Sequence, residues 1–279
     1  MARLLRVQFP PFAPLFKGKA YMDIGKLTIT KRDLGRIPDK DRIFFLQMLN
    51  LITEINIFQK LLLYSMTYPK NDTQKTAKAQ ISLNLLFVLA GKLFEGWKLI
   101  DERKPKEKNP KKGGRKKRFS QNWFPRKYKS RLTSDGKNNL SYLQDYFNKP
   151  NNIKKIRNKI SNHYDSGLIR DHFPNTKMNN ICLYLPQFVG EIFSTSNYIT
   201  LDGFFTPIDP NQKKAFEIVI KEVLGVSKNL GSLIGDYIGI IHEKYLKQVK
   251  FEKLSIPDPK STDKMHLTFF SKPSKKKLK

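Results

Sequence analysis

Three side chains near the middle of the chain have types and a spacing that suit cleavage of a phosphodiester. Arg157 is followed directly by Asn158, and His163 comes after five intervening residues. A guanidinium fork can bind two phosphoryl oxygens, and an imidazole can transfer protons near neutral pH. Cleavage of RNA without a metal needs a base for the 2′-OH, an acid for the leaving 5′-oxygen and cations for the phosphate. These three residues supply those groups within two helical turns.

An ideal helix through this motif does not bring Arg157 and His163 to one point. The step of six positions from Arg157 to His163 turns the side chains about 120° apart around the helix axis. It also places them roughly 9 Å apart along that axis. One chain alone is therefore not expected to bring both side chains to one phosphate. A structural role is the alternative, in which Arg157 pairs with an acidic neighbour and His163 caps the end of a helix.

The run from Ile156 to Asp165 resembles the signature motif of the HEPN superfamily, small helical domains many of which are ribonucleases that need no metal. The resemblance implies an endoribonuclease that cuts single-stranded or loop RNA by 2′-OH attack, with no cofactor and no metal site. It also implies a composite site, built in a homodimer or with a partner that carries a second HEPN motif. Members of the superfamily include toxins and phage-defence effectors.

Two acidic residues are candidates to support the motif. HEPN proteins often carry an acidic residue that faces the motif's arginine, so the resemblance implies that Glu95 orients Arg157 or His163. The alternative is a surface glutamate that pairs with Lys92 or Lys98 at a spacing of three residues. Asp165 is expected either to accept a hydrogen bond from His163 or to lie in a turn before Gly167.

The charge of the chain predicts a polyanionic partner. Lys and Arg number 53 against 24 Asp and Glu, a formal net charge of +29 over 279 residues. Such a surface favours nucleic acid or an anionic membrane. A genome rich in A and T would explain the many lysines but not the scarcity of acidic residues. RNA is therefore the expected partner.

Residues 103–131 form the most basic segment, with fourteen Lys or Arg among 29 positions and prolines and glycines that oppose regular structure. A solvated linker is one interpretation. Aromatic residues interleaved with the charges favour the other, a strand-binding loop, because bases stack on rings while cations follow phosphates. Together with lysines beside the motif, the predicted RNA-binding residues are Lys111, Lys112, Arg115, Lys116, Lys117, Arg118, Trp123, Phe124, Arg126, Lys127, Tyr128, Lys154, Lys155 and Lys159.

Apolar residues at three- and four-residue steps predict helices over most of the chain. The first begins near Asp39, the second is capped by Asp72 or Thr73, and together they predict a long antiparallel pair. Helical periodicity returns in 138–147, through the motif, and after Asp209-Pro210. The expected fold is mainly all-α, an up-and-down helical bundle.

Three parts are expected along the chain. Residues 1–38 form an N-terminal arm with one β-prone stretch at 26–30, residues 39–250 form the HEPN-like domain with its basic insertion, and residues 251–279 form a disordered basic tail.

The expected location is the cytoplasm, without a membrane anchor. Cys182 is the single cysteine and can form no internal disulfide. Prolines interrupt the first sixteen residues before a signal peptide could form, and the apolar run at 81–94 is too short to span a bilayer.

Two other function classes stay open beside the endoribonuclease. One is a non-catalytic RNA-binding protein that holds a structured RNA. The other, an interaction module or membrane-surface binder, is less favoured because the aromatic residues lie between charges and not along one amphipathic stripe.

Overall fold

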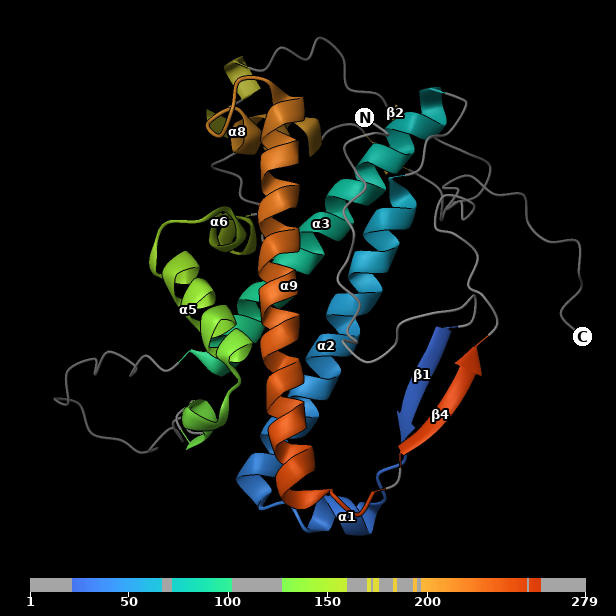
Figure 1. Cartoon of the computed structure of the whole chain (residues 1–279). Helices are drawn as coiled ribbons and strands as arrows, with labels where there is room; N and C mark the ends of the chain where they lie inside the picture. Colours follow the sequence, from blue (N-terminus) through green and yellow to red (C-terminus); the bar gives the residue numbers. More distant parts are fainter. Residues whose placement is uncertain are drawn as a thin grey trace, which may run out of the picture.

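The chain folds as a mainly helical bundle around one long C-terminal helix (Figure 1). The computed structural model describes residues 22–66, 72–101, 127–159, 170–171, 173–175, 183–184, 193–194, 197–249 and 251–256. Within these ranges the helices are α1 (Lys31–Gly35), α2 (Asp39–Ser65), α3 (Asp72–Ile100), α5 (Ser134–Asn148), α6 (Asn152–Lys159), α8 (Asn197–Phe205) and α9 (Gln212–Tyr245). The expected all-α class is confirmed.

The antiparallel helical pair predicted from the apolar periodicity is formed by α2 and α3. Helix α9 packs against both of them, α5 packs on α9, and α6 packs on α3 (Figure 1). Gly96 of α3 allows the close approach of α2, because a Cβ atom there would lie 2.6 Å from Leu51 Cδ2 and 3.2 Å from Leu230 Cδ2. This packing brings α3, α6 and α9 together around the motif.

Helix α3 is also long and apolar enough to cross a membrane by length and composition over Thr76–Ile100, as no other helix of the described residues is. Yet 56% of its most apolar window is buried inside the fold. Contacts with α2, α6 and α9 account for that apolar composition.

The two ends of the described chain meet in a β-ribbon, which corrects two expectations. Strand β1 (Met22–Leu27) pairs antiparallel with β4 (Phe251–Ile256), and Lys26 lies opposite Glu252 in a 3.3 Å ion pair (Figure 1). The predicted strand at 26–30 therefore begins and ends earlier. The prediction of disorder beyond residue 250 is wrong for 251–256, whose backbone groups find partners in β1, while residues 257–279 lie outside the described part.

Two short helical details differ from the sequence expectation. Within the expected N-terminal arm, Thr30 caps α1 in a reciprocal capping box with Asp33. Helix α5 begins at Ser134, four residues before the predicted start, because Thr133 accepts a hydrogen bond from the backbone of Gly136. A second pair of short strands, β2 (Leu183–Tyr184) and β3 (Phe193–Ser194), and the 3-10 turns η1 (Lys129–Arg131) and η2 (Phe173–Asn175) complete the described elements.

Candidate functional site

Helix α6 carries the first two residues of the motif and is anchored at its N-terminal end by Asn151. The side-chain oxygen Oδ1 of Asn151 accepts a hydrogen bond from the backbone of Lys154 at 2.8 Å. The side-chain Nδ2 donates to the carbonyl oxygens of Tyr146 at 3.3 Å and Lys149 at 2.9 Å. Because Pro150 cannot continue a helix, the chain turns here, and Asn151 closes both helix ends at the turn. The turn fixes α6 against the end of α5.

A carboxylate from α9 holds the same end of α6. The side chain of Glu222 accepts hydrogen bonds from the Asn152 backbone at 3.2 Å, from the Asn152 amide at 2.7 Å and from the Tyr146 hydroxyl. Burial raises the pKa of Tyr146, and its hydrogen bond to Glu222 raises that pKa further. A negative charge at a helix N-terminus is also favourable to the helix dipole. Glu222 therefore connects α9, α5 and α6.

The apolar side of α6 determines which residues of the motif face outward. Ile153 and Ile156 are fully buried against the core, whereas Asn158 is exposed and Arg157 is half-buried. Because Ile153 and Ile156 are three residues apart, they lie on one face of α6, which packs inward. Arg157 lies at the edge of this face. That position places the guanidinium over α3.

Arg157 contacts Glu95 across the α3–α6 interface. Its Nε donates to Glu95 Oε1 at 3.0 Å, and Lys98 Nζ lies 2.9 Å from the same oxygen. Burial opposes ionisation of Glu95, but hydrogen bonds from Lys98 and Arg157 outweigh it and hold its pKa below the ordinary value. Both arrangements considered for Glu95 are therefore present at once, the contact with the motif arginine and the local pair with Lys98.

An aromatic surface lies beneath the guanidinium. The Arg157 Cζ atom lies 5.6 Å from the centre of the Phe94 ring, which in turn lies 6.2 Å from the ring of Phe147. Phe147 stacks on Trp97 with ring centres 5.1 Å apart. Arg157 Nη1 also donates to Asn158 Oδ1 at 3.3 Å. A cation over a ring and a carboxylate at its edge restrict the orientation of this arginine.

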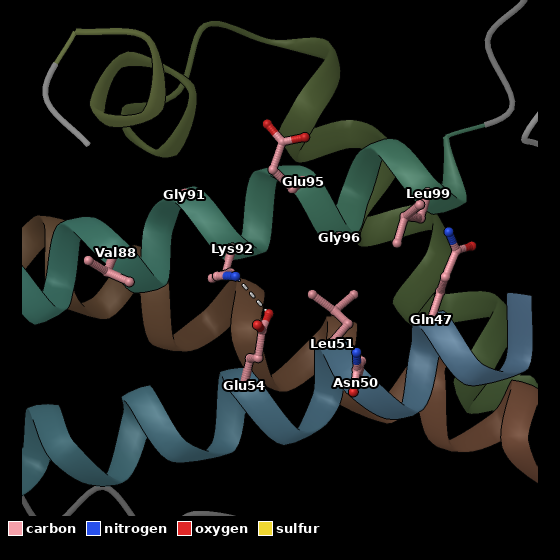
Figure 2. Close-up of a pocket in the computed structure, with 10 residues that line it drawn as sticks. All are labelled: Gln47, Asn50, Leu51, Glu54, Val88, Gly91, Lys92, Glu95, Gly96 and Leu99. Atoms are coloured by element: carbon pink, nitrogen blue, oxygen red, sulfur yellow. Dashed lines mark ion pairs between the residues drawn. The ribbon is translucent and has the colours of Figure 1, made fainter. Parts of the chain in front are cut away.

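A groove of about 400 Å³ lies between α2 and α3, and Glu95 is among the residues that line it. Figure 2 shows Glu95 pointing away from this groove's α2 wall, while Lys92 reaches across to Glu54. That ion pair measures 2.9 Å, so Lys92 does not pair with Glu95. Glu95 is thus available to the α6 side of α3.

The prediction that Tyr128, at the end of the basic insertion, contacts RNA is wrong. Tyr128 is only 1% exposed and donates a 2.7 Å hydrogen bond to Asp41, so it cannot stack on a base. Its apolar ring completes the core where α2 begins and α9 ends. Lys127 forms a 2.8 Å ion pair with the same fully buried Asp41, so its charge is compensated within the protein.

The remaining predicted residues fall into two groups. Lys154 and Lys155 are exposed on α6 beside Arg157, while nothing is described of the side chain of Lys159 at the helix end. Outside the described residues lie His163, Asp165 and the predicted contacts of the basic segment, namely Lys111, Lys112, Arg115, Lys116, Lys117, Arg118, Trp123, Phe124 and Arg126.

Sequence reasoning missed three residues that organise this region. Asp41 looked like an ordinary acidic residue of a first helical turn, and only its long-range partners reveal its burial. Glu222 lies far along the chain from α6, so no local pattern indicates it. Asn151 did carry a signal, since an asparagine after proline and before an apolar helix is a typical N-cap.

Comparison with known proteins leaves the family open, since no family model, no curated protein and no solved structure matches this chain. Among the described residues, no group of three or more His, Cys, Asp or Glu side chains is arranged to hold a metal ion.

Proposed function

We propose that this protein is an endoribonuclease of HEPN type that cuts single-stranded or loop RNA by attack of a ribose 2′-OH on the adjacent phosphate. The observation that carries the proposal is the placement of Arg157. It is held by Glu95 and Phe94 at the surface of α6, with Asn158 as its polar neighbour. A guanidinium fixed in this way is suited to stabilise charge on a phosphate because little reorganisation is needed.

Each group of the motif has a role in the proposed reaction. The 2′-oxygen bonds to phosphorus as its proton passes to a base, and the bond to the 5′-oxygen breaks as that oxygen takes a proton from an acid. His163 transfers protons, Arg157 stabilises the phosphate charge and Asn158 orients it. The products are a 2′,3′-cyclic phosphate and a 5′-OH.

A second motif, from another copy of this chain or from a partner protein, completes the proposed site. The two proton transfers need a base and an acid at the same time, and one histidine cannot be both. A role as a toxin or phage-defence effector follows from the same resemblance and is part of this proposal.

The test is cleavage of a labelled single-stranded RNA by the purified full-length protein in EDTA. Arg157→Ala and His163→Ala should each abolish cleavage. Arg32→Ala on the exposed part of α1 and His242→Ala on α9 are matched controls that remove the same residue types elsewhere and should cleave as the wild type does. Cleavage at the wild-type rate by both Arg157→Ala and His163→Ala, or a requirement for Mg²⁺, contradicts the mechanism.

A non-catalytic RNA-binding protein is the second candidate. The observation that favours it is the ion pair of Arg157 with Glu95, which already compensates the charge that catalysis would use. Such a protein would copurify with a defined RNA, show a high ratio of absorbance at 260 nm to that at 280 nm, and leave the RNA intact over hours.

A further inference from the structure

A second pocket lies beside Arg157, at the turn between α5 and α6. It has a volume of about 390 Å³ and is lined by Asn148, Lys149, Pro150, Asn151, Lys154, Lys155 and Asn158. Three of these seven residues are lysines, and none is acidic. Pockets of this size accommodate small ligands such as one nucleotide unit.

The three lysines of this pocket carry charge that the described part of the protein does not compensate. Lys149, Lys154 and Lys155 are all exposed, and no described carboxylate pairs with their ammonium groups. By contrast, the cations on either side are paired, Lys98 and Arg157 with Glu95. Positive charges gathered in a concave site attract an anion more strongly than the same charges spread over a flat surface.

Hydrogen bonds fix the turn that forms the pocket, and two backbone donors at the start of α6 are already occupied. Asn151 and Glu222 take up the amide hydrogens of Lys154 and Asn152 at the start of α6. The helix N-terminus itself is therefore not the anion site. The lysine side chains and the exposed amide of Asn158 are the groups left to contact a ligand.

Asn158 connects the pocket to the motif. It lines the pocket and accepts the hydrogen bond from Arg157 Nη1 at 3.3 Å. An anion bound in the pocket would therefore be next to the group that is proposed to bind the scissile phosphate. In a nucleic acid strand, the neighbouring anion is the next phosphodiester.

We infer that this pocket, which we call the flanking-phosphate pocket, binds a phosphodiester adjacent to the scissile one and sets the position of a single strand along the site. The inference rests on the proposed function. Because lysine ammonium groups act as point charges that pair with phosphate, the pocket contributes affinity and position and does not read the base sequence.

Binding is measured by fluorescence anisotropy with a labelled 2′-O-methyl oligonucleotide, which cannot be cleaved by 2′-OH attack, in EDTA over a range of NaCl concentrations. The pocket variant is Lys149→Gln/Lys154→Gln/Lys155→Gln in the full-length chain. The matched control is Lys137→Gln/Lys221→Gln/Lys228→Gln, which removes the same charge from exposed positions on α5 and α9. Circular dichroism and urea unfolding of both variants check the fold.

Because the pocket binds one phosphodiester, the pocket variant should flatten the slope of log affinity against log salt by about 0.7 and weaken binding roughly 5-fold in 0.1 M salt. With cleavable RNA, KM should rise and kcat should stay near the wild-type value. The control variant should keep the wild-type slope. Equal slopes for the two variants, or a fall in kcat with unchanged KM, overturn the inference.

Failure of the pocket and failure of the proposed function give different results. If the wild-type protein never cuts RNA, and the slope of log affinity against log salt flattens only in the pocket variant, the proposed nuclease activity is wrong and the phosphate pocket stands. If cleavage in EDTA depends on Arg157, and the pocket variant and its control bind the strand equally well, the proposed nuclease activity stands and the phosphate pocket is wrong. Inorganic phosphate that binds the wild-type protein but not the pocket variant, without displacing the strand at constant ionic strength, would make the pocket a site for free phosphate and overturn the strand-positioning role.

Discussion

Replacing Glu222 with glutamine should weaken the contact of α9 with α6 and lower the stability of the bundle. Oε1 of Glu222 accepts hydrogen bonds from the Tyr146 hydroxyl and the Asn152 backbone, and Oε2 accepts one from the Asn152 amide at 2.7 Å. A glutamine can keep the first two with its single oxygen. Its NH₂ group then faces the NH₂ of Asn152, so that two donors meet where a donor met an acceptor.

The expected cost follows from that replacement. One charge-assisted hydrogen bond is lost and two others become neutral, and hydrogen bonds to charged groups contribute about 1.5–3 kcal/mol each. Because Glu222 is only partly buried, we expect a loss of roughly 1.5–3 kcal/mol in total for Glu222→Gln, at the scale of one such bond. Unfolding in urea, followed by circular dichroism of the helices, measures this free energy.

Glu243→Gln is the matched control, an identical change at an exposed site on the same helix α9, for which the expected effect is within about 0.5 kcal/mol. Combining Glu222→Gln with Asn152→Ala completes a double-mutant cycle. The two changes should cost less together than the sum of each alone, by about 1–2 kcal/mol, because the contact is lost only once. Equal effects of the two glutamate replacements, or strict additivity in the cycle, would refute the assigned role of Glu222.

Four further predictions concern residues that support the helices and the site. Gly136→Ala should destabilise the protein by about 1–3 kcal/mol in urea unfolding, because the new Cβ would lie 1.9 Å from Asp236 Oδ2, which binds Thr133. Gly239→Ala, with open space around it in α9, should instead stabilise by up to about 1 kcal/mol. Glu95→Gln should cost up to about 1 kcal/mol at pH 7. The pKa of Glu95 lies below its ordinary value of 4.5. The difference in unfolding free energy between the wild type and this variant should therefore be full above pH 4.5 and disappear as the pH falls through the lowered pKa. Asp41→Ala should cost about 3–5 kcal/mol in the same assay, because it leaves Lys127 and two tyrosine hydroxyls without their shared acceptor, and an effect below 1 kcal/mol would contradict that account.

The helical class was accessible from the sequence because it rests on local periodicity. Apolar side chains at three- and four-residue steps in α2, α3 and α9 leave one broad face to bury, and only helix–helix packing buries all three. The contact of Glu95 with Arg157 joins α3 to α6. The superfamily resemblance indicated this contact, whereas periodicity alone could not.

The elements that sequence reasoning placed incorrectly depend on partners far along the chain. Strand β4 has six residues and is not stable alone, because its hydrogen bonds are made with β1. Its own sequence therefore does not distinguish it from a disordered basic tail. Tyr128 follows a run of cations that suggested base stacking, yet Asp41 and Tyr245 bury its hydroxyl. Glu222 likewise acquires its role only when α9 lies against the start of α6.

The most direct measurement of the central claim compares one single-stranded RNA with the same strand carrying 2′-O-methyl groups, both incubated with the wild-type protein in EDTA. Attack by the 2′-OH predicts that the RNA is cut to fragments ending in 2′,3′-cyclic phosphate, while the methylated strand is bound and stays intact. Cleavage of the methylated strand, or fragments of the RNA ending in 3′-OH, would contradict the account.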